Sequence, residues 1–401
     1  MKKRESIAAG APALFFAAAL IYAFAFPFCA PARAAIVYSS DEGKERQLYS
    51  VEPGAAPVQL TKKDSPDLLR VYNMFPAVSS DGSRIAYASY RIYNDEGLRL
   101  WKQWNGKAIY PQEEFYFYFY SYFPTRTYYT RHKSLNWNIY MKDLKTGRER
   151  KISNFLWDEY EPQFLSRDSD ILYVLTAETS TFVLRGSKSG KSFKQVVLKN
   201  NQAIHPQISP DGRELVYQSF QPGNWDLYTM TMADLPSKRI ETRLTATSYV
   251  SELFPRWTPD GKSIYYLADS RNAHFYDIYL MNLATREITQ ITKRERVGAD
   301  VVISPNGDRF AYTADLGRGR ALFVVNKDGA GKKMLTLPTE TVFFPAWSPD
   351  GKRLAFLSDA AGSAPGKSGE KMISLYAVNA DGTGRTPVVQ KPCFLSPIIW
   401  Y

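Results

Sequence analysis

The sequence is poor in the residues that form disulfides and bind transition metals. Its 401 residues include two cysteines, Cys29 and Cys393, and three histidines, His132, His205 and His274. Cys29 lies in an N-terminal apolar segment, so a processed chain would keep one thiol and no internal disulfide. The histidines fall in different units of the chain, without metal-ligand spacing. We therefore predict no metal site and no cofactor.

Charge runs and catalytic motifs are also missing. The formal net charge is +11, but it is spread over the chain without a cluster of Lys or Arg. Such a bias favours acidic surfaces and is weak evidence for nucleic acid, which we exclude as a partner. No G-x-S-x-G elbow occurs, and a loose phosphate-loop pattern at residues 361–368 is followed by a predicted strand where a helix is required. We predict that the chain is not an enzyme.

The N-terminus carries the one long apolar run. Basic residues 2–4 precede 22 residues of apolar character, and residues 32–34 supply the small side chains that a signal peptidase requires. We predict a signal peptide over residues 1–34 with cleavage after Ala34, and a periplasmic or otherwise exported protein without a transmembrane span after cleavage. An uncleaved membrane anchor is the alternative.

A phrase of 13 residues recurs along the rest of the chain. Each copy combines a short apolar strand, a turn resembling Ser-Pro-Asp-Gly, and a second strand that ends in an aromatic residue. In the turn, Pro presets φ, Asp bonds back to the backbone, and Gly accepts a positive φ. The copies begin at Phe75, Glu161, His205, Phe254, Asp300 and Phe344.

A second phrase, such as DIYLMNLATREITQIT from Asp277, follows the first and adds two strands to each unit. Four strands in about 45 residues are typical of a propeller blade. The sequence after residue 35 predicts the last three strands of a blade, and the C-terminal FLSPIIWY predicts its first strand, so the two ends would close the ring. We predict an all-β, seven-bladed β-propeller over residues 35–401, with six or eight blades as alternatives.

These phrases resemble the WD40-like (PD40) propeller repeat of the TolB family. The resemblance rests on the repeated turn, as in SPDG at 209–212 and 348–351, followed by a strand such as DLY or DIY. It implies a periplasmic propeller that binds other molecules of the cell envelope and catalyses nothing. TolB proteins carry an α/β domain ahead of a six-bladed propeller, and this chain has no room for that domain between its signal and its first strands. The resemblance therefore leaves open whether the family's Tol–Pal partners apply.

Residues 92–136 form an aromatic-rich insertion between the second and third strands of the second blade. This insertion holds 14 aromatic residues, and its segment FYFYFYSYF alternates Phe and Tyr, as a strand with two different faces does. We expect the insertion to rise from the face where the first strands begin, and to offer aromatic side chains for contact. The alternative is a self-packed hairpin. The candidate binding residues are Trp101, Trp104, Tyr116, Tyr118, Tyr120 and Tyr122.

The same face should carry the residue just before each first strand, close to the central opening. These residues are Ser396, Phe75, Glu161, His205, Phe254, Asp300 and Phe344. Together they would form a mouth that receives an extended peptide or a small ligand. Alternatively, the Phe side chains simply plug the channel.

Two functions follow. The first is a monomeric, non-catalytic binding or scaffold propeller that recognises a protein or peptide partner at the face with the insertion. The second is a carbohydrate-binding or carbohydrate-cleaving, lyase-like propeller that uses the insertion as a sugar-stacking platform. Fold alone does not separate them.

Overall fold

The computed structural model describes most of the chain between residues 34 and 401. The described ranges are 34–41, 45–63, 65, 67–93, 137–155, 158–165, 170–177, 180–196, 203–221, 224–233, 238–269, 275–360, 372–393 and 396–401. Within these ranges the regular elements are 28 β-strands and no α-helix. They all belong to one compact unit, Arg33–Tyr401. The described part contains no helix with the length and apolar character needed to cross a membrane.

Five four-stranded antiparallel sheets follow one another along the chain. The first two contain β8 (Asp158–Phe164), β9 (Asp170–Ala177), β10 (Ser180–Ser187) and β11 (Phe193–Gln195), then β12 (Ala203–Ile208), β13 (Glu214–Gln221), β14 (Asn224–Thr231) and β15 (Glu241–Arg243). The third contains β16 (Glu252–Trp257), β17 (Ser263–Ala268), β18 (Asp277–Asn282) and β19 (Ile288–Gln290). The last two contain β20 (Val302–Ile303), β21 (Arg309–Asp315), β22 (Arg320–Asn326) and β23 (Lys333–Met334), then β24 (Val342–Trp347), β25 (Arg353–Ser358), β26 (Ser374–Asn379) and β27 (Thr386–Val389).

A larger, eight-stranded sheet joins the two ends of the described chain. Its strands are β28 (Ile399–Trp400), β1 (Ile36–Asp41), β2 (Arg46–Val51), β3 (Val58–Gln59), β4 (Arg70–Val78), β5 (Arg84–Ile92), β6 (Trp137–Asp143) and β7 (Glu149–Lys151). The C-terminal β28 pairs antiparallel with the N-terminal β1, with Trp400 opposite Ile36. Between β2 and β4 there is a single parallel pair, Arg46 with Tyr72.

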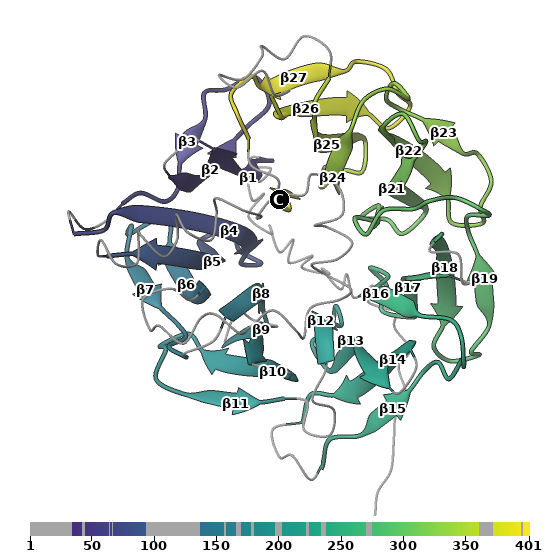
Figure 1. The fold of residues 1–401 in the computed structure, drawn as a ribbon, viewed down its shortest axis with the longest axis horizontal. Coiled ribbons are helices and arrows are strands. Elements are labelled where there is room, and N and C mark those ends of the chain that lie inside the picture. The colour runs from purple at the N-terminus through teal and green to yellow at the C-terminus, as the bar shows by residue number, and fades with distance from the viewer. Residues whose placement is uncertain are drawn as a thin grey trace, which may run out of the picture. The chain divides into compact units, whose positions relative to one another are not determined.

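The sheets succeed one another around a centre, with β4, β8, β12, β16 and β24 on the inside and the fourth strands on the outside (Figure 1). We call β4, β8, β12, β16, β20 and β24 the first strands. The predictions of an all-β fold and of four-stranded antiparallel units are confirmed.

The turns between first and second strands have the predicted chemistry wherever they are described. In the turn after β12, the Ser209 hydroxyl donates to Asp211 at 2.6 Å, and the same carboxylate accepts the Arg213 N–H at 3.0 Å. Gly212 takes φ 74°, which glycine adopts without steric cost. The third copy of the turn, residues 166–169, lies outside the described residues.

A repeated aromatic pair links the second and third strands of every unit except the sheet β8 to β11, where Tyr173 lies opposite Leu184. The second-strand ring stacks on a third-strand ring with centroids 5.5 to 6.2 Å apart, so the two strands are tied on the face that packs between sheets. The pairs are Tyr38–Tyr49, Tyr87–Tyr140, Tyr217–Tyr228, Tyr266–Tyr279, Tyr312–Phe323 and Phe356–Tyr376.

Candidate functional site

Each first strand except β20 contains a bulge that turns one side chain toward the centre. The pairing register shifts within β4, β8, β12, β16 and β24, each time at the residue before proline. That residue adopts a left-handed φ of 52° to 54°, which is strained for a side chain other than glycine. Strain of this kind is held by the surrounding structure and is common at functional sites. The bulged residues are Phe75, Glu161, His205, Phe254 and Phe344.

These positions correct one part of the sequence prediction. We expected the residues to precede the first strands, but they lie within them: Glu161, for example, is the fourth residue of Asp158–Phe164. Pro162 follows it directly, and the bulge accommodates a residue without an N–H inside a paired strand. At β20, Val301 replaces proline, and Asp300 does lie before the strand. Asp300 is not among the residues with positive φ.

Backbone amides at three bulges are bonded by side chains of neighbouring units. Phe254 N–H donates to Gln218 Oε1 at 2.6 Å, and Phe344 N–H donates to Asp300 Oδ2 at 2.6 Å. The third, Phe75 N–H, donates to Ser396 Oγ at 3.2 Å. Asp300 also accepts the Thr313 hydroxyl at 2.7 Å, so both of its oxygens serve the fold. A bulge removes ladder partners from the backbone, and these contacts replace them.

The first strands surround a cavity of about 720 Å³, which we call the central cavity. Six of the seven predicted mouth residues line it: Phe75, Glu161, His205, Phe254, Asp300 and Phe344. Ser396 is not among the lining residues. Further lining comes from the segments 76–78, 162–165, 207–210, 255–259 and 397–399. The structure therefore brings together residues that are spread over 270 positions of sequence, from Phe75 to Phe344.

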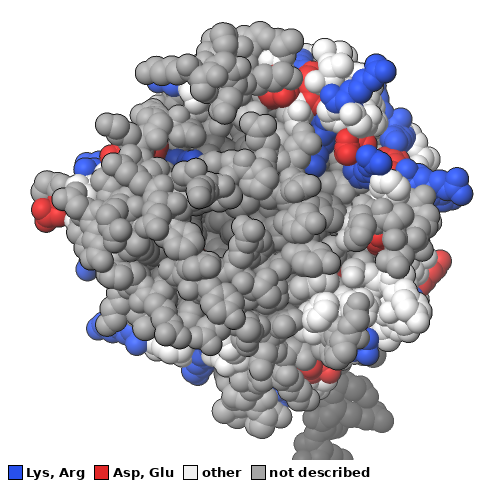
Figure 2. All heavy atoms as spheres, viewed as in Figure 1, with Lys and Arg blue, Asp and Glu red and all other residues white. Residues whose placement is uncertain are grey.

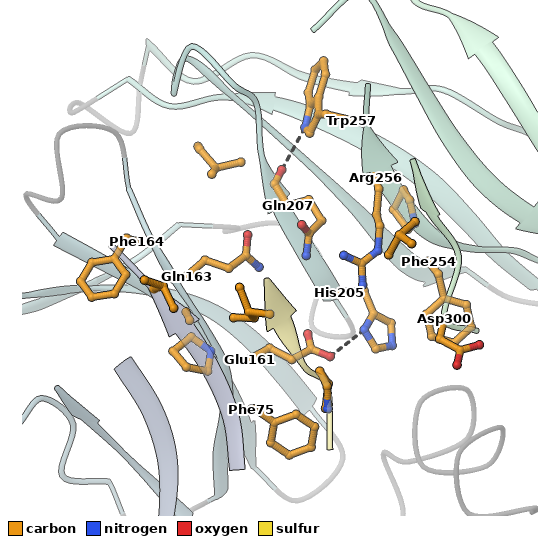
Figure 3. A pocket seen from close by; sticks show the side chains of 18 of the residues that line it. Phe75, Glu161, Gln163, Phe164, His205, Gln207, Phe254, Arg256, Trp257 and Asp300 are labelled. Atoms are coloured by element: carbon orange, nitrogen blue, oxygen red, sulfur yellow. Dashed lines mark hydrogen bonds and ion pairs between the residues drawn. The ribbon is translucent and has the colours of Figure 1, made fainter. Parts of the chain in front are cut away.

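The cavity has two chemically distinct parts. Strands β8, β12 and β16 contribute Glu161, Gln163, His205, Gln207 and Arg256, which we call the polar sector (Figure 3). The remaining wall, which we call the apolar sector, is formed by Phe75, Ala77, Val302, Phe344 and Ile398, with Asp300 as its one charged residue among the described lining.

Glu161 and His205 form a pair within the polar sector. His205 Nδ1 lies 2.7 Å from Glu161 Oε1, with side-chain exposures of 9% and 14% (Figure 3). The His205 ring also lies against Phe254, with centroids 4.7 Å apart. The second carboxylate oxygen, Glu161 Oε2, is buried and has no hydrogen-bond partner among the described residues. A buried acceptor in that state is costly unless a donor reaches it.

Arg256 is a site residue that sequence reasoning missed. It lines the cavity half-buried, and in the described part of the chain no hydrogen bond or ion pair involves its guanidinium group. The signal was available in the repeats: the residue after the proline is Ala77, Gln163, Gln207, Arg256 and Ala346 in successive proline-containing copies. Only the copy FPRW places a charge there, and aligning the copies would have revealed it.

Two inter-sheet bonds fix the strands around the cavity. Trp257 Nε1–H donates to the Gln207 carbonyl at 3.0 Å (Figure 3), and Trp347 Nε1–H donates to the Val302 carbonyl at 3.4 Å. Both tryptophans are largely buried. They hold each first strand against the preceding one, so the positions of the cavity side chains are set by rigid neighbours.

The predicted residues of the insertion, Trp101, Trp104, Tyr116, Tyr118, Tyr120 and Tyr122, lie outside the described residues. The described chain on either side of them is placed: Ile92 pairs with Arg70 at the start of β4, and Trp137 pairs with Tyr90. The chain thus leaves and re-enters the sheet at the end where its first strand begins.

His132 and His274 also lie outside the described residues. Within the described ranges, no group of three or more His, Cys, Asp or Glu side chains is arranged to hold a metal ion.

Antiparallel four-stranded sheets around a cavity lined by their innermost strands define the class of β-propellers. A family model described as the TolB beta propeller domain matches residues 120–347. The chain belongs to this family, and the resemblance inferred from its repeats is confirmed.

Comparisons with individual proteins agree on the architecture. Tol-Pal system protein TolB of Francisella tularensis subsp. mediasiatica is 26% identical over 229 residues, covering 55% of this chain and 51% of that protein. The chain thus spans about half the length of the curated relatives it matches. A puromycin-hydrolysing peptidase of Mycobacterium tuberculosis superposes with a TM-score of 0.59 at 12% identity, over 89% of this chain and 53% of that one. An oligogalacturonate lyase in complex with manganese superposes with a TM-score of 0.53 at 12% identity, over 88% of this chain and 84% of that one. At such identities the two solved structures show a common fold alone.

Proposed function

We propose that this chain is an exported, non-catalytic binding propeller of the cell envelope that holds a protein or peptide partner at the mouth of the central cavity. The observation that carries the proposal is the cavity itself: five strained, bulged residues turn toward one space of about 720 Å³. A cavity of that size admits a chain end or an extended segment, and is too small for a folded domain. The curated relatives bear the name of the Tol-Pal system, which supports an envelope protein as partner.

The proposal includes a ring of seven blades. Counting β28, β1, β2 and β3 as one blade and β4 to β7 as a second divides the eight-stranded sheet at its single parallel pair. The other five sheets supply one blade each. In this arrangement the pairing of β28 with β1 closes the ring and removes an open edge.

The proposal also includes residues 1–34 as a cleaved export signal, residues 35–401 as the propeller, and residues 92–136 as an inserted element beside the mouth. We propose that the aromatic side chains of the insertion extend the contact made by the cavity. The chain's exit at Ile92, next to the start of β4, supports an insertion on the face where first strands begin.

Position-specific crosslinking tests the proposal. A photoreactive residue at Tyr249, which is 82% exposed and precedes β16, would report on the face where first strands begin. The same photoreactive amino acid in place of Arg213, in the turn after β12, would report on the opposite face and is the control. In cells we expect one envelope protein to crosslink from Tyr249 and not from Arg213.

A second variant, in which residues 95–134 are replaced by a short Gly/Asn turn, tests the insertion. It should remain folded and lose most of the crosslink. Crosslinks from both faces alike, or displacement of the captured molecule by envelope glycans, would contradict a protein partner at the cavity mouth. Displacement by glycans would favour the carbohydrate-binding alternative.

A further inference from the structure

We propose that the polar sector of the central cavity binds a carboxylate group of a peptide, held by Arg256 and Gln207. This inference rests on the proposed function, because it names the chemical group that a peptide partner would insert.

The first argument is the unbalanced charge of Arg256. The guanidinium group is half-buried in the cavity wall, and no carboxylate in the described part of the chain pairs with it. Other partly buried arginines of this protein do have such partners: Arg385 makes a bidentate contact with Glu340 at 2.6 and 2.7 Å, and Arg91 lies 2.5 Å from Glu149. Removing an arginine from water without a partner is unfavourable, and a planar anion is the partner that its fork fits best.

The second argument is the position of Gln207. It occupies on β12 the bulge-relative position that Arg256 occupies on β16, directly after the proline. Its side-chain amide makes no hydrogen bond with any described residue, and both side chains are directed into the cavity (Figure 3). Two adjacent strands thus present an amide donor and a guanidinium donor to the same space. Such a pair matches the two oxygens of a carboxylate.

The third argument is a buried hydrogen-bond acceptor, Glu161 Oε2, in the same polar sector. Glu161 Oε2 is buried without a donor, on the strand β8 beyond β12. An entering ligand would therefore meet donors on β12 and β16 and an acceptor on β8. A peptide supplies both complements, a carboxylate for the donors and backbone N–H groups for the acceptor.

The apolar and aromatic lining of the cavity favours a peptide over an acidic sugar. Phe254 and Phe344 are 9% and 6% exposed, and the His205 ring covers Phe254, so these rings do not offer open faces for sugar stacking. Ala77, Val302 and Ile398 instead form a surface suited to aliphatic side chains.

The rim of the propeller complements a negative ligand as well. Lys293, Arg294 and Arg296, in the connection to β20, are exposed, and so is Arg318 between β21 and β22. Lys and Arg side chains gather along the rim on the side of β21, β22 and β23 (Figure 2). A basic rim raises the encounter rate of an acidic segment with the cavity at low ionic strength.

Titration with four probes tests the proposal on the whole exported chain. The probes are acetyl-Gly-Gly-Ala-Ala with a free carboxyl terminus, its C-terminal amide, the amidated peptide acetyl-Gly-Asp-Ala-Ala, and digalacturonate. We expect at least one carboxylate peptide to bind about tenfold more tightly than the uncharged amide, since hydrogen bonds to charged groups are the stronger ones. The first and third probes distinguish a chain terminus from an acidic side chain.

Variants assign the effect to the site. Arg256→Gln should remove the preference for the carboxylate peptides, whereas Arg256→Lys should keep part of it, because lysine retains the charge and loses the bidentate fork. Arg213→Gln, at an exposed turn outside the cavity, is the matched control and should change nothing. Unchanged thermal unfolding would establish that each variant is folded.

Three results would overturn the proposal: neither carboxylate peptide binding more tightly than the uncharged amide, a preference that survives Arg256→Gln, or tighter binding of digalacturonate than of either carboxylate peptide. The proposed function has a separate test. If a protein crosslinks from Tyr249 equally in the Arg256→Gln variant, the envelope partner stands and the carboxylate site does not. If the carboxylate peptides bind through Arg256 and no protein crosslinks, the reverse holds.

Discussion

The polar and apolar sectors of the central cavity share a backbone and differ in what their side chains do. In the apolar sector, Asp300 uses both oxygens, one for Phe344 N–H and one for the Thr313 hydroxyl. In the polar sector, Arg256 has no hydrogen bond with any described residue, and Glu161 Oε2 has none either. The carboxylate oxygens of Asp300 therefore make hydrogen bonds within the fold, whereas Arg256 and Glu161 Oε2 in the polar sector can still bond to a ligand.

The repeat provides a constant backbone frame, the first strands and the bonds between them, on which the side chain at a single position can vary from copy to copy. The same inter-sheet bond occurs on both sides, from Trp257 to Gln207 and from Trp347 to Val302. A frame held by such bonds tolerates different side chains at the position after the proline: Arg256 and Ala77 both line the cavity there, whereas Ala346 packs in a buried cluster.

Replacing the tryptophans should have the largest effect. We expect Trp347→Ala to lower the free energy of unfolding by about 3 to 5 kcal/mol, because it leaves a void in a buried cluster and removes an inter-sheet hydrogen bond. Trp257→Ala, its counterpart in the polar sector, should cost a similar amount. Denaturant unfolding measures both. A cost below about 1 kcal/mol for one and not the other would show that the two sectors do not share a common frame.

Removing the Asp300 side chain should have the next largest effect. Asp300→Ala leaves Phe344 N–H without its side-chain acceptor and also removes the acceptor of the Thr313 hydroxyl, so we expect a loss of about 1 to 3 kcal/mol. Asp328→Ala is the control, since its bond to Ala330 N–H is exposed and water can replace it. If both variants lose equally little, Asp300 is not a structural member of the apolar sector.

The sequence predicted the frame well because its signals are local. The Ser-Pro-Asp-Gly turns and the aromatic residue of each second strand are readable within one copy, and the structure pairs the strands on both sides of each turn. The second strands run beyond the aromatic that was expected to end them, as β17 does beyond Tyr266. The sequence analysis did not identify buried hydroxyl groups that follow five of the fourth strands, at Thr61, Ser153, Thr245, Thr292 and Thr336. Thr245 and Thr292, for example, each accept a third-strand N–H at 2.9 Å.

The sequence did not predict how the cavity residues are presented. Proline in a sheet normally occupies an edge strand or the first position of a strand, so the sequence predicts that the residue before it lies outside the strand. In the structure the proline lies within the strand at a β-bulge, and the residue before it, such as His205, adopts a left-handed φ. That solution depends on acceptors from neighbouring units, such as Gln218 for Phe254 N–H, which are distant in sequence. The sequence analysis did not identify Arg256, because what distinguishes this residue is that no described carboxylate pairs with it. That property is seen only in the three-dimensional structure.

The pH dependence of stability should also separate the sectors. Two residues before the bulge, β8 carries Glu159 and β16 carries Glu252, whereas β24 carries Val342. Burial raises the pKa of Glu159 to about 8 and that of Glu252 to about 7. For Glu159, hydrogen bonds from Ser153 and Phe155 N–H and the charge of Lys151 act in the opposite direction without cancelling the effect of burial.

A raised pKa in the folded state means that the native protein holds the proton more tightly than the unfolded chain. The stabilisation is therefore complete below the unfolded pKa of 4.5 and is lost as pH rises through about 7 and about 8. We expect the free energy of unfolding to fall as pH rises from about 5 to about 8. The double variant Glu159→Gln, Glu252→Gln should reduce that slope in denaturant titrations at each pH, and Asp158, whose pKa burial raises to about 6, should account for part of what remains. A slope that is unchanged in the double variant would assign the pH dependence to other groups.

Neutralising Glu161 should have the smallest effect on stability. Glu161→Gln keeps an oxygen that accepts the His205 Nδ1–H, and the other oxygen, Oε2, has no described partner to lose. We expect a change below about 1 kcal/mol, in contrast to the larger loss for Asp300→Ala on the opposite wall. Denaturant unfolding of the two variants under the same conditions makes the comparison direct. A loss as large as that of Asp300→Ala would mean that Glu161 is bound into the fold, and the polar sector would then have no acceptor available to a ligand.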